Sequence, residues 1–185
     1  MSLASERLDY EVINGQVYMM AQPTMNHIAI AGNINWIFKN FLRDKTCKTY
    51  SEPDVFLDEQ NNFVPDVVIL CDRSKRTLKG IYGAPDLVVE ILSKSTAKRD
   101  MEEKKGIYEK YGVKEYWLVN PFSMEITVYH SRDGLFRIDN IYSYVPAEKF
   151  EQFPDEEKRA VMTRFKTSLF EDLEIKVADV FDDVE

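Results

Sequence analysis

Hydrophobic residues follow two different periods along the chain, and the changes between them predict a mixture of strands and helices. Residues 8–21 contain two β-prone arms on either side of Asn14-Gly15, a dipeptide that adopts the positive φ angles of a tight hairpin turn. The segment 85–93, PDLVVEILS, is apolar on both faces, which is typical of a strand in the centre of a sheet. Further strands are predicted at 49–59, 63–70, 113–120 and 124–130.

Helical spacing occurs in two segments. In the first segment, residues 26–45, apolar side chains recur every three or four positions, so this helix should pack one face on a sheet. Thr24 or Asn26 can cap its first turn. Its apolar positions are Ala31, Ile34, Phe38, Phe41 and Leu42. The charged segment 96–112 is the second predicted helix, and it should end at Gly112 because glycine commonly terminates helices.

The order of these elements predicts the α/β class: a hairpin, a helix, three strands, a helix and two more strands suggest a mixed sheet. No internal repeat or linker divides the 185 residues, and a hydrophobic content of 44% is enough to bury a core. We therefore predict one domain over 1–185. Within it, 146–165 resembles a polar helical excursion, and 168–181 returns to short apolar segments that close the core.

The charge of the chain limits the kinds of partner it can have. A formal net charge of −8 argues against coating nucleic acid by bulk attraction, because such binding relies on a cationic surface that neutralises phosphates. A local basic groove is still compatible with it, since Lys and Arg concentrate at 73–80 and 94–105. The simpler interpretation of each basic stretch is ordinary solvated surface.

The expected location of the protein is a reducing cytoplasm. The N-terminus lacks a basic region followed by an apolar one, and no apolar run approaches the length of a membrane span. The two cysteines, Cys47 and Cys71, lack a CxxC or His-rich context, so they predict neither a disulfide framework nor a zinc site.

Two carboxylates accompany apolar runs: Asp66 begins one run and Glu90 lies inside the next. A charged carboxylate inside a sheet is costly unless a cation or a set of donors compensates it, so both should lie at a strand end or pocket near a shared partner. Oxygen ligands of this kind suit Mg²⁺ or Mn²⁺. The alternative is that Asp66 and Asp86 are turn residues after Pro65 and Pro85, while Glu90 faces solvent on an edge strand.

One face of the second predicted helix combines polar and aromatic residues. The face contains Asp100, Lys104, Ile107, Tyr108 and Tyr111. Because Ile107 and the tyrosines mark the inward side, Lys104 should point towards the sheet. There it could orient or deprotonate a water, or stabilise charge on a phosphate. The alternative is an Asp100–Lys104 pair that only stabilises the helix.

Several segments carry a resemblance to a known family. They are PDVVI with Asp66, PDLVVEILSKST with Glu90, RDMEEKKGIYEKYGVKEYWLVNP with Asp100, Lys104 and Tyr108, and the opening YEVINGQVYMMAQPTMNHIAIAGNI with Glu11 and His27. In combination they resemble the widespread bacterial family of restriction-endonuclease-like proteins of unknown function, a branch of the PD-(D/E)XK nuclease superfamily. The resemblance covers residues 9–130 well and the closing segment loosely. It implies a mixed central sheet flanked by helices, with metal-binding acids on neighbouring strands.

The resemblance also implies roles for individual residues. Asp66 takes the place of the first motif acid and Glu90 that of the second. The superfamily lysine lies two residues after the second acid, where this chain has Leu92. Either Lys104 supplies the amine from the helix or the site lacks its lysine. Lys94 is a weaker candidate because it follows the strand in a loop.

Glu11 and His27 are supporting candidates, each with two interpretations. Glu11 lies between Tyr10 and Val12 on the first strand, and could approach the metal from the other side of the site or face solvent. His27 begins the first helix on its apolar side, and could be a partly buried histidine satisfied by backbone or a contact for phosphate or water.

The function implied by the resemblance is phosphodiester hydrolysis with Mg²⁺ (or Mn²⁺) as the only cofactor, because neither a P-loop nor a dinucleotide fingerprint is present. Nucleic acid is the expected partner, and DNA is favoured over RNA. A catalytically inactive nuclease fold that serves as a binding or regulatory module is the alternative. A third interpretation is an α/β interaction protein whose apolar edge forms a homodimer.

Overall fold

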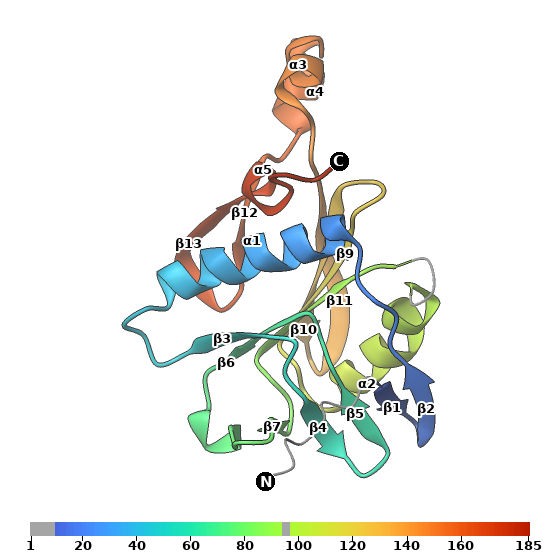
Figure 1. Cartoon of the computed structure of the whole chain (residues 1–185). Coiled ribbons are helices and arrows are strands. Elements are labelled where there is room, and N and C mark those ends of the chain that lie inside the picture. Colours follow the sequence, from blue (N-terminus) through green and yellow to red (C-terminus); the bar gives the residue numbers. More distant parts are fainter. Residues whose placement is uncertain (1–9, 94–96) are drawn as a thin grey trace, which may run out of the picture.

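The computed structural model describes residues 10–93 and 97–185, which form an α/β fold around a six-stranded mixed sheet (Figure 1). Strands β8 and β9 run parallel, and the other neighbours run antiparallel. The predicted class is confirmed, and segment 85–93 supplies the central strand β8. In spatial order the strands are β11 (Leu135–Ser143), β10 (Glu125–Arg132), β9 (Glu115–Asn120), β8 (Leu87–Ile91), β6 (Val67–Leu70) and β3 (Lys48–Ser51).

A second sheet, of five strands, contains the predicted N-terminal hairpin. The hairpin turn has φ values of 51° at Asn14 and 77° at Gly15, the left-handed angles that this dipeptide tolerates. The stretch 49–59, predicted as one strand, is divided between the two sheets, since Glu52 has a φ of 46° and Pro53 has no N–H to donate. The strands of this sheet are β2 (Gln16–Met19), β1 (Tyr10–Ile13), β5 (Asn61–Phe63), β4 (Val55–Asp58) and β7 (Ile81–Tyr82).

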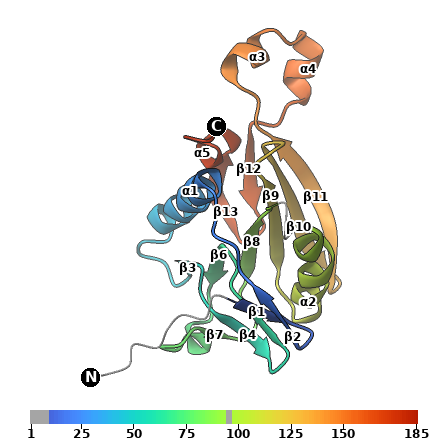
Figure 2. The same ribbon diagram turned by 45° about the vertical axis from the view of Figure 1, so that its right-hand side comes forward.

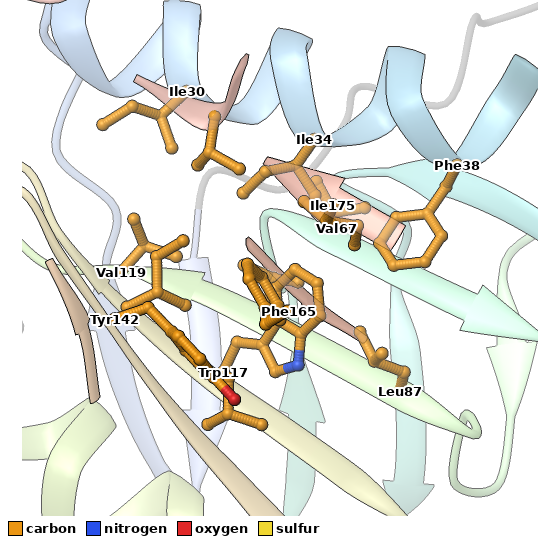
Figure 3. Packing of buried hydrophobic residues seen from close by; sticks show 14 of the residues in the cluster. Ile30, Ile34, Phe38, Val67, Leu87, Trp117, Val119, Tyr142, Phe165 and Ile175 are labelled. Atoms are coloured by element: carbon orange, nitrogen blue, oxygen red, sulfur yellow. The ribbon is translucent and has the colours of Figure 1, made fainter. Parts of the chain in front are cut away.

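Helix α1 (Met25–Phe41) covers one face of the six-stranded sheet, as its apolar spacing predicts (Figure 3). The Thr24 hydroxyl caps it by accepting a hydrogen bond from the His27 N–H. On its inward side Ile30, Ile34 and Phe38 are fully buried against the sheet. Burial of each such side chain stabilises the fold by about 1.5–3 kcal/mol, so α1 is held firmly on the sheet.

The second helical segment packs against the opposite face. It begins as a π-helical turn, η2 (Arg99–Lys104), and continues as α2 (Lys105–Lys110). The chain leaves the helix through Gly112, whose φ of 82° is the left-handed conformation expected at a helix end. Its buried residues Ile107 and Tyr108 join a second apolar cluster with sheet residues that point away from α1. The central strands are therefore buried on both faces.

The last part of the chain forms an arm and a closing hairpin. Helices α3 (Ala147–Glu151) and α4 (Asp155–Ala160) project from the body within the stretch predicted as helical, 146–165 (Figure 2). Strands β12 (Arg164–Thr167) and β13 (Phe170–Lys176) and helix α5 (Val177–Val180) then close the core. The sequence pattern did not predict β11, which pairs with β10 on the edge of the sheet.

A buried carboxylate fastens the closing hairpin to the central sheet. Glu115 is fully buried and accepts hydrogen bonds from Trp117 Nε1 at 2.6 Å and from the Ser168 N–H at 2.7 Å. Because Ser168 lies between β12 and β13, this carboxylate links the hairpin to β9.

The prediction that the cysteines form no disulfide is wrong. Cys47 precedes β3 and Cys71 follows β6, and continuing the antiparallel register from Lys48 opposite Leu70 brings the two cysteines face to face. A disulfide joins them. Their sequence context could not reveal this pairing, because it depends on which strands become neighbours. In the ranges that the structure describes, no helix is both long and apolar enough to cross a membrane.

Candidate active site

The two predicted acids lie opposite each other on neighbouring strands. Val67 of β6 pairs with Val89 of β8, so the next position in the same register places Asp66 opposite Glu90. The N–H of Ile91 donates to Asp66 Oδ2 at 2.6 Å, which fixes one oxygen of that carboxylate. Glu90 is 4% exposed on a central strand, so the interpretation that it faces solvent on an edge strand is wrong.

Asp86, like Asp66, lies in a bend just before a strand, close to the turn position that the alternative interpretation gave both residues. Its carboxylate accepts a hydrogen bond from the Cys71 N–H at 2.7 Å and lies 2.8 Å from Lys114 Nζ. Asp86 precedes β8, whereas Glu90 lies near its end. Asp86 is therefore separate from the site that contains Glu90.

Lys104 is buried at the centre of an acidic cluster. Its Nζ lies 2.7 Å from Glu11 Oε1, 3.2 Å from Glu90 Oε1 and 3.3 Å from Asp100 Oδ1. The side chain is only 3% exposed and points towards the sheet, as the helical phase predicts. The Asp100–Lys104 pair exists, but the same ammonium also contacts two carboxylates from outside the helix.

The π-helical turn holds this part of the helix against the sheet. Asp100 and Lys104 both lie in η2 and are both buried. The hydroxyl of Tyr116 on β9 donates to the backbone carbonyl of Asp100 at 2.9 Å. Turns of this kind are rare and often occur at functional sites. Here the turn presents a charged pair to β8 instead of to solvent.

Glu11 and Tyr108 complete the surroundings of the lysine. Glu11 comes from β1 in the other sheet, and its Oε1 also accepts the Val64 N–H at 2.9 Å. It is buried, so the solvent-facing interpretation of Glu11 is wrong. The hydroxyl of Tyr108, one turn after Lys104, donates to Glu90 Oε1 at 2.9 Å. Residues from two sheets and one helix thus meet at this point.

His27 contacts Asp66, a partner that neither interpretation of the sequence anticipated. Its Nε2 lies 2.6 Å from Asp66 Oδ1. Because an ionised carboxylate only accepts hydrogen bonds, the ring nitrogen must carry the proton. Burial lowers the pKa of His27, but the hydrogen bond and charge of Asp66 outweigh this effect, so the pKa is raised above 6.5.

The site holds more negative than positive charge. Burial raises the pKa of Glu90 well above its ordinary value, and the charge of Lys104 only partly offsets this effect. Burial alone would lower the pKa of Lys104, but the carboxylates of Glu90, Glu11 and Asp100 outweigh it and raise the pKa above its usual range. Counting Asp66 and its partner His27, four carboxyl groups gather near one ammonium and one imidazole ring. This excess favours a bound cation.

The donors at the site fit a hard divalent ion with few protein ligands. In the described ranges, no group of three or more His, Cys, Asp and Glu side chains is arranged as a metal site. Mg²⁺ needs no such group, since one or two carboxylates commonly hold it while water and substrate complete its octahedron. Each oxygen of Asp66 accepts one hydrogen bond and keeps a second lone pair. Asp66 and Glu90 therefore suit Mg²⁺ or Mn²⁺.

A cleft of about 900 Å³ opens above these residues. Its floor contains Glu11, Asp66, Glu90, Asp100 and Lys104. Leu92, at the position of the superfamily lysine, is a buried apolar residue in its wall. Lys94 lies outside the described residues.

The walls of the cleft include residues that the sequence did not identify as part of a site. They come from the connection between β2 and α1, from the turn between β9 and β10, and from η2. Phe122 in the β9–β10 turn and Arg99 in η2 are the main examples. Arg99 lies within the basic stretch 94–105 and close to Glu90 in the sequence, whereas no local pattern marks Phe122, which is distant in sequence from both acids.

Comparison with known proteins identifies the family. The sequence model of Uma2, a family described as "Putative restriction endonuclease", matches residues 2–158. The chain belongs to the Uma2 family.

Other chains resemble this one in sequence or in fold. An uncharacterized protein of Synechocystis is 33% identical over 132 residues, which cover 69% of each chain. A second uncharacterized Synechocystis protein is 26% identical over 64% of this chain and 70% of its own length. The fold also matches a crystal structure from Anabaena variabilis, described as a "putative nuclease belonging to DUF820", with a TM-score of 0.66, 18% identity, and coverage of 93% of this chain and 89% of that chain. This Uma2 protein therefore shares its fold with the Anabaena chain.

Proposed function

We propose that this Uma2 protein hydrolyses phosphodiester bonds in nucleic acid, with DNA as the first candidate, in a reaction that depends on Mg²⁺ or Mn²⁺. The observation that carries the proposal is the arrangement of three residues. The strand register places Asp66 opposite Glu90, and Lys104 Nζ lies 3.2 Å from Glu90 Oε1. Membership of a family described as "Putative restriction endonuclease", and a fold shared with a chain described as a "putative nuclease", favour the same chemistry.

In the proposed mechanism Asp66 and Glu90 would hold the metal. Such an ion, when bound, polarises the scissile phosphate and lowers the pKa of a bound water. His27 fixes the orientation of Asp66 through its hydrogen bond at 2.6 Å, and Tyr108 does the same for Glu90 at 2.9 Å. Both carboxylates are thus positioned before substrate arrives, which is the condition for efficient electrostatic catalysis.

Lys104 acts in this mechanism as a hydrogen-bond donor. Because the surrounding carboxylates raise its pKa, the ammonium stays protonated at neutral pH and does not serve as a base for water. It can orient the attacking water or stabilise charge on the phosphate. Glu11 and Asp100 hold the ammonium in place through their own ion pairs with it.

The test is nicking of supercoiled plasmid in Mg²⁺ or Mn²⁺ by the native protein, Asp66→Asn and Lys104→Met. An exposed lysine on α1 provides the control variant Lys39→Met, prepared identically so that a contaminating nuclease is detected. We expect metal-dependent nicking by the native protein and by Lys39→Met only. Circular dichroism of each variant separates loss of the fold from loss of activity. Equal nicking by all four proteins would refute the proposal.

A binding or regulatory module is the second candidate. It is favoured by Leu92 at the position of the superfamily lysine and by the net charge of −8. Native protein that binds nucleic acid but is inert in both metals on plasmid, single-stranded, branched and RNA substrates would support this candidate.

A single domain over 1–185, a cytoplasmic location and a homodimer are also parts of our proposal. Concentration-dependent sizing tests the homodimer, and limited proteolysis tests the domain. Fractionation of cells that express the chain tests the location.

A further inference from the structure

The connection between β6 and β7 concentrates positive charge in an otherwise acidic chain. We call residues 72–80 the basic loop: it contains four cations and a single carboxylate, whereas the whole chain has a formal net charge of −8. The cations are Arg73, Lys75, Arg76 and Lys79, all exposed except the half-buried Lys75, and the carboxylate is Asp72. Four cations and one carboxylate leave the basic loop with three positive charges in excess.

These cations are not neutralised within the protein. Among the residues that the structure describes, no carboxylate forms an ion pair with any of the four. Lys75 Nζ donates to the Ala84 carbonyl at 2.8 Å. The guanidinium of Arg76 lies 5.8 Å from the ring centroid of Tyr50. A carbonyl and a tyrosine ring carry no net charge, so both contacts leave the positive charge available to an anion outside the protein.

The basic loop is an ordered part of the fold. At its start the Asp72 carboxylate accepts hydrogen bonds from the N–H and the hydroxyl of Ser74. Near its end the Thr77 N–H donates to the Gly80 carbonyl at 2.8 Å, and β7, directly after the loop, pairs with β4. Cations on a backbone that is held in this way lose less conformational freedom when they bind, which favours contact with several phosphates at once.

The cleft itself supplies little attraction for a polyanion. Among the described residues that line it, Arg99 and the buried Lys104 are the only Lys or Arg, and its floor is rich in carboxylates. The backbone of nucleic acid carries closely spaced phosphates and is bound mainly through several Lys and Arg contacts. Because neither a duplex nor a single strand finds such contacts in the cleft, they must come from another part of the surface.

The basic loop and the acids of the site lie at opposite ends of β6 (Figure 1). Asp66 precedes this strand and Arg73 follows it, a separation of at most about 23 Å at about 3.3 Å per residue. A duplex spans that length in about seven base pairs. The edge strand β3 pairs with β6 along this path, and its residues Lys48–Ser51 include no Asp or Glu. One nucleic-acid backbone can therefore extend from the basic loop along β3 towards the cleft.

We propose that the basic loop binds the sugar-phosphate backbone of nucleic acid outside the cleft, with Arg73, Arg76 and Lys79 each contacting a phosphate. That the anion is a nucleic acid rests on the function proposed above. Backbone contacts position a substrate without reading its bases, so this binding is independent of sequence. A lipid surface fits less well, because Leu78 is the only apolar side chain in the loop and membrane binding takes a broad apolar face or a lipid anchor.

The experiment measures binding as a function of salt. Fluorescence anisotropy, with Ca²⁺ in place of Mg²⁺ or Mn²⁺, follows a labelled DNA duplex and an RNA duplex of the same sequence over a series of KCl concentrations. The loop variant carries Arg73→Gln, Arg76→Gln and Lys79→Gln. The control variant removes three exposed charges from α1, β11 and α3 through Lys39→Gln, Arg137→Gln and Lys149→Gln. Circular dichroism checks that both variants are folded.

The slope of log K against log salt counts the phosphate contacts, since each contributes about 0.9 on a DNA duplex. We expect the slope of the loop variant to be shallower than that of the native protein by about 2.7, and the control variant to keep the native slope. Comparison of the two duplexes identifies the nucleic acid. An unchanged slope in the loop variant, an equal loss in the control variant, or no binding of either duplex would overturn the inference. Loop-dependent binding of phosphatidylserine vesicles but of neither duplex would also overturn it and would identify a lipid partner.

The plasmid assay tests the proposed hydrolysis separately. Loop-dependent binding of a duplex without metal-dependent nicking would support the inference and refute the nuclease. Nicking by a native protein whose salt slope does not change in the loop variant would leave the nuclease proposal in place and overturn the inference.

Discussion

The ammonium of Lys104 lies 2.7 Å from the carboxylate of Glu11, and this contact joins the helix on one face of the central sheet to the N-terminal hairpin. Both side chains are nearly inaccessible to solvent. A buried charge pair is costly to break, since removing one partner leaves the other uncompensated. The contact therefore stabilises the fold and also holds the geometry of the site.

Replacing the lysine should destabilise the protein. Lys104→Met leaves the buried carboxylates of Glu11 and Glu90 without their cation, so we expect the free energy of unfolding to fall by about 3–5 kcal/mol. Urea denaturation measures this loss, with Lys39→Met as the matched control. Adding Glu90→Gln to Lys104→Met should recover part of the stability, because it removes one buried charge. A Lys104→Met protein that is as stable as Lys39→Met would contradict the prediction.

Removing the hydroxyl of Tyr108 should leave the carboxylate of Glu90 less firmly positioned. Tyr108→Phe keeps the buried ring but deletes the hydrogen bond of 2.9 Å, and loss of a bond to a charged group costs about 1.5–3 kcal/mol. Plasmid nicking should fall as well, because Glu90 becomes free to reorient. Tyr111→Phe is the control, since it deletes an exposed bond to Asp58. Similar effects of the two substitutions on stability and nicking would argue against a positioning role for Tyr108.

The charge of His130 should depend on two neighbouring carboxylates. Glu115 is the main cause that raises the pKa of His130 above 6.5, and Asp139, 3.3 Å from Nδ1, adds to it. A histidine with a raised folded pKa stabilises the protein in full below about pH 6.5, and this contribution is lost as pH rises through the folded pKa. NMR titration of the ring, assigned with His27→Gln, should show a pKa above 6.5 that falls in Asp139→Asn. An unchanged pKa in that variant would refute the role of Asp139.

The disulfide should stabilise the oxidised protein. Cys47 and Cys71 are 24 positions apart, and closing a loop of this length in the unfolded chain contributes about 3 kcal/mol. Cys47→Ser should lower the free energy of unfolding by about that amount in oxidising buffer and have little effect in a reductant. Mass spectrometry of the intact chain checks that the bond is present. Two free thiols in the oxidised, folded protein would contradict the structure at this point.

The amino-acid sequence determined those features that depend on neighbouring residues. The Asn14-Gly15 turn follows from the φ angles that this dipeptide tolerates. The orientation of Lys104 follows from helical phase relative to Ile107 and Tyr108, and the central place of β8 follows from its two apolar faces. Each of these needs only a short stretch of chain, so the acids and the lysine could be selected before the fold was known.

Only the tertiary structure decided which distant groups meet. The pairing of Glu11 with Lys104, the contact of His27 with Asp66 and the bond between Cys47 and Cys71 all join segments that are far apart in the sequence. Strand order and register set these contacts, and a shift of one residue would turn Asp66 to the other face of the sheet. Register depends on how whole strands pair and bury their side chains. For this reason the sequence determined which residues could form the site, and the packing of the two sheets determined how they are arranged.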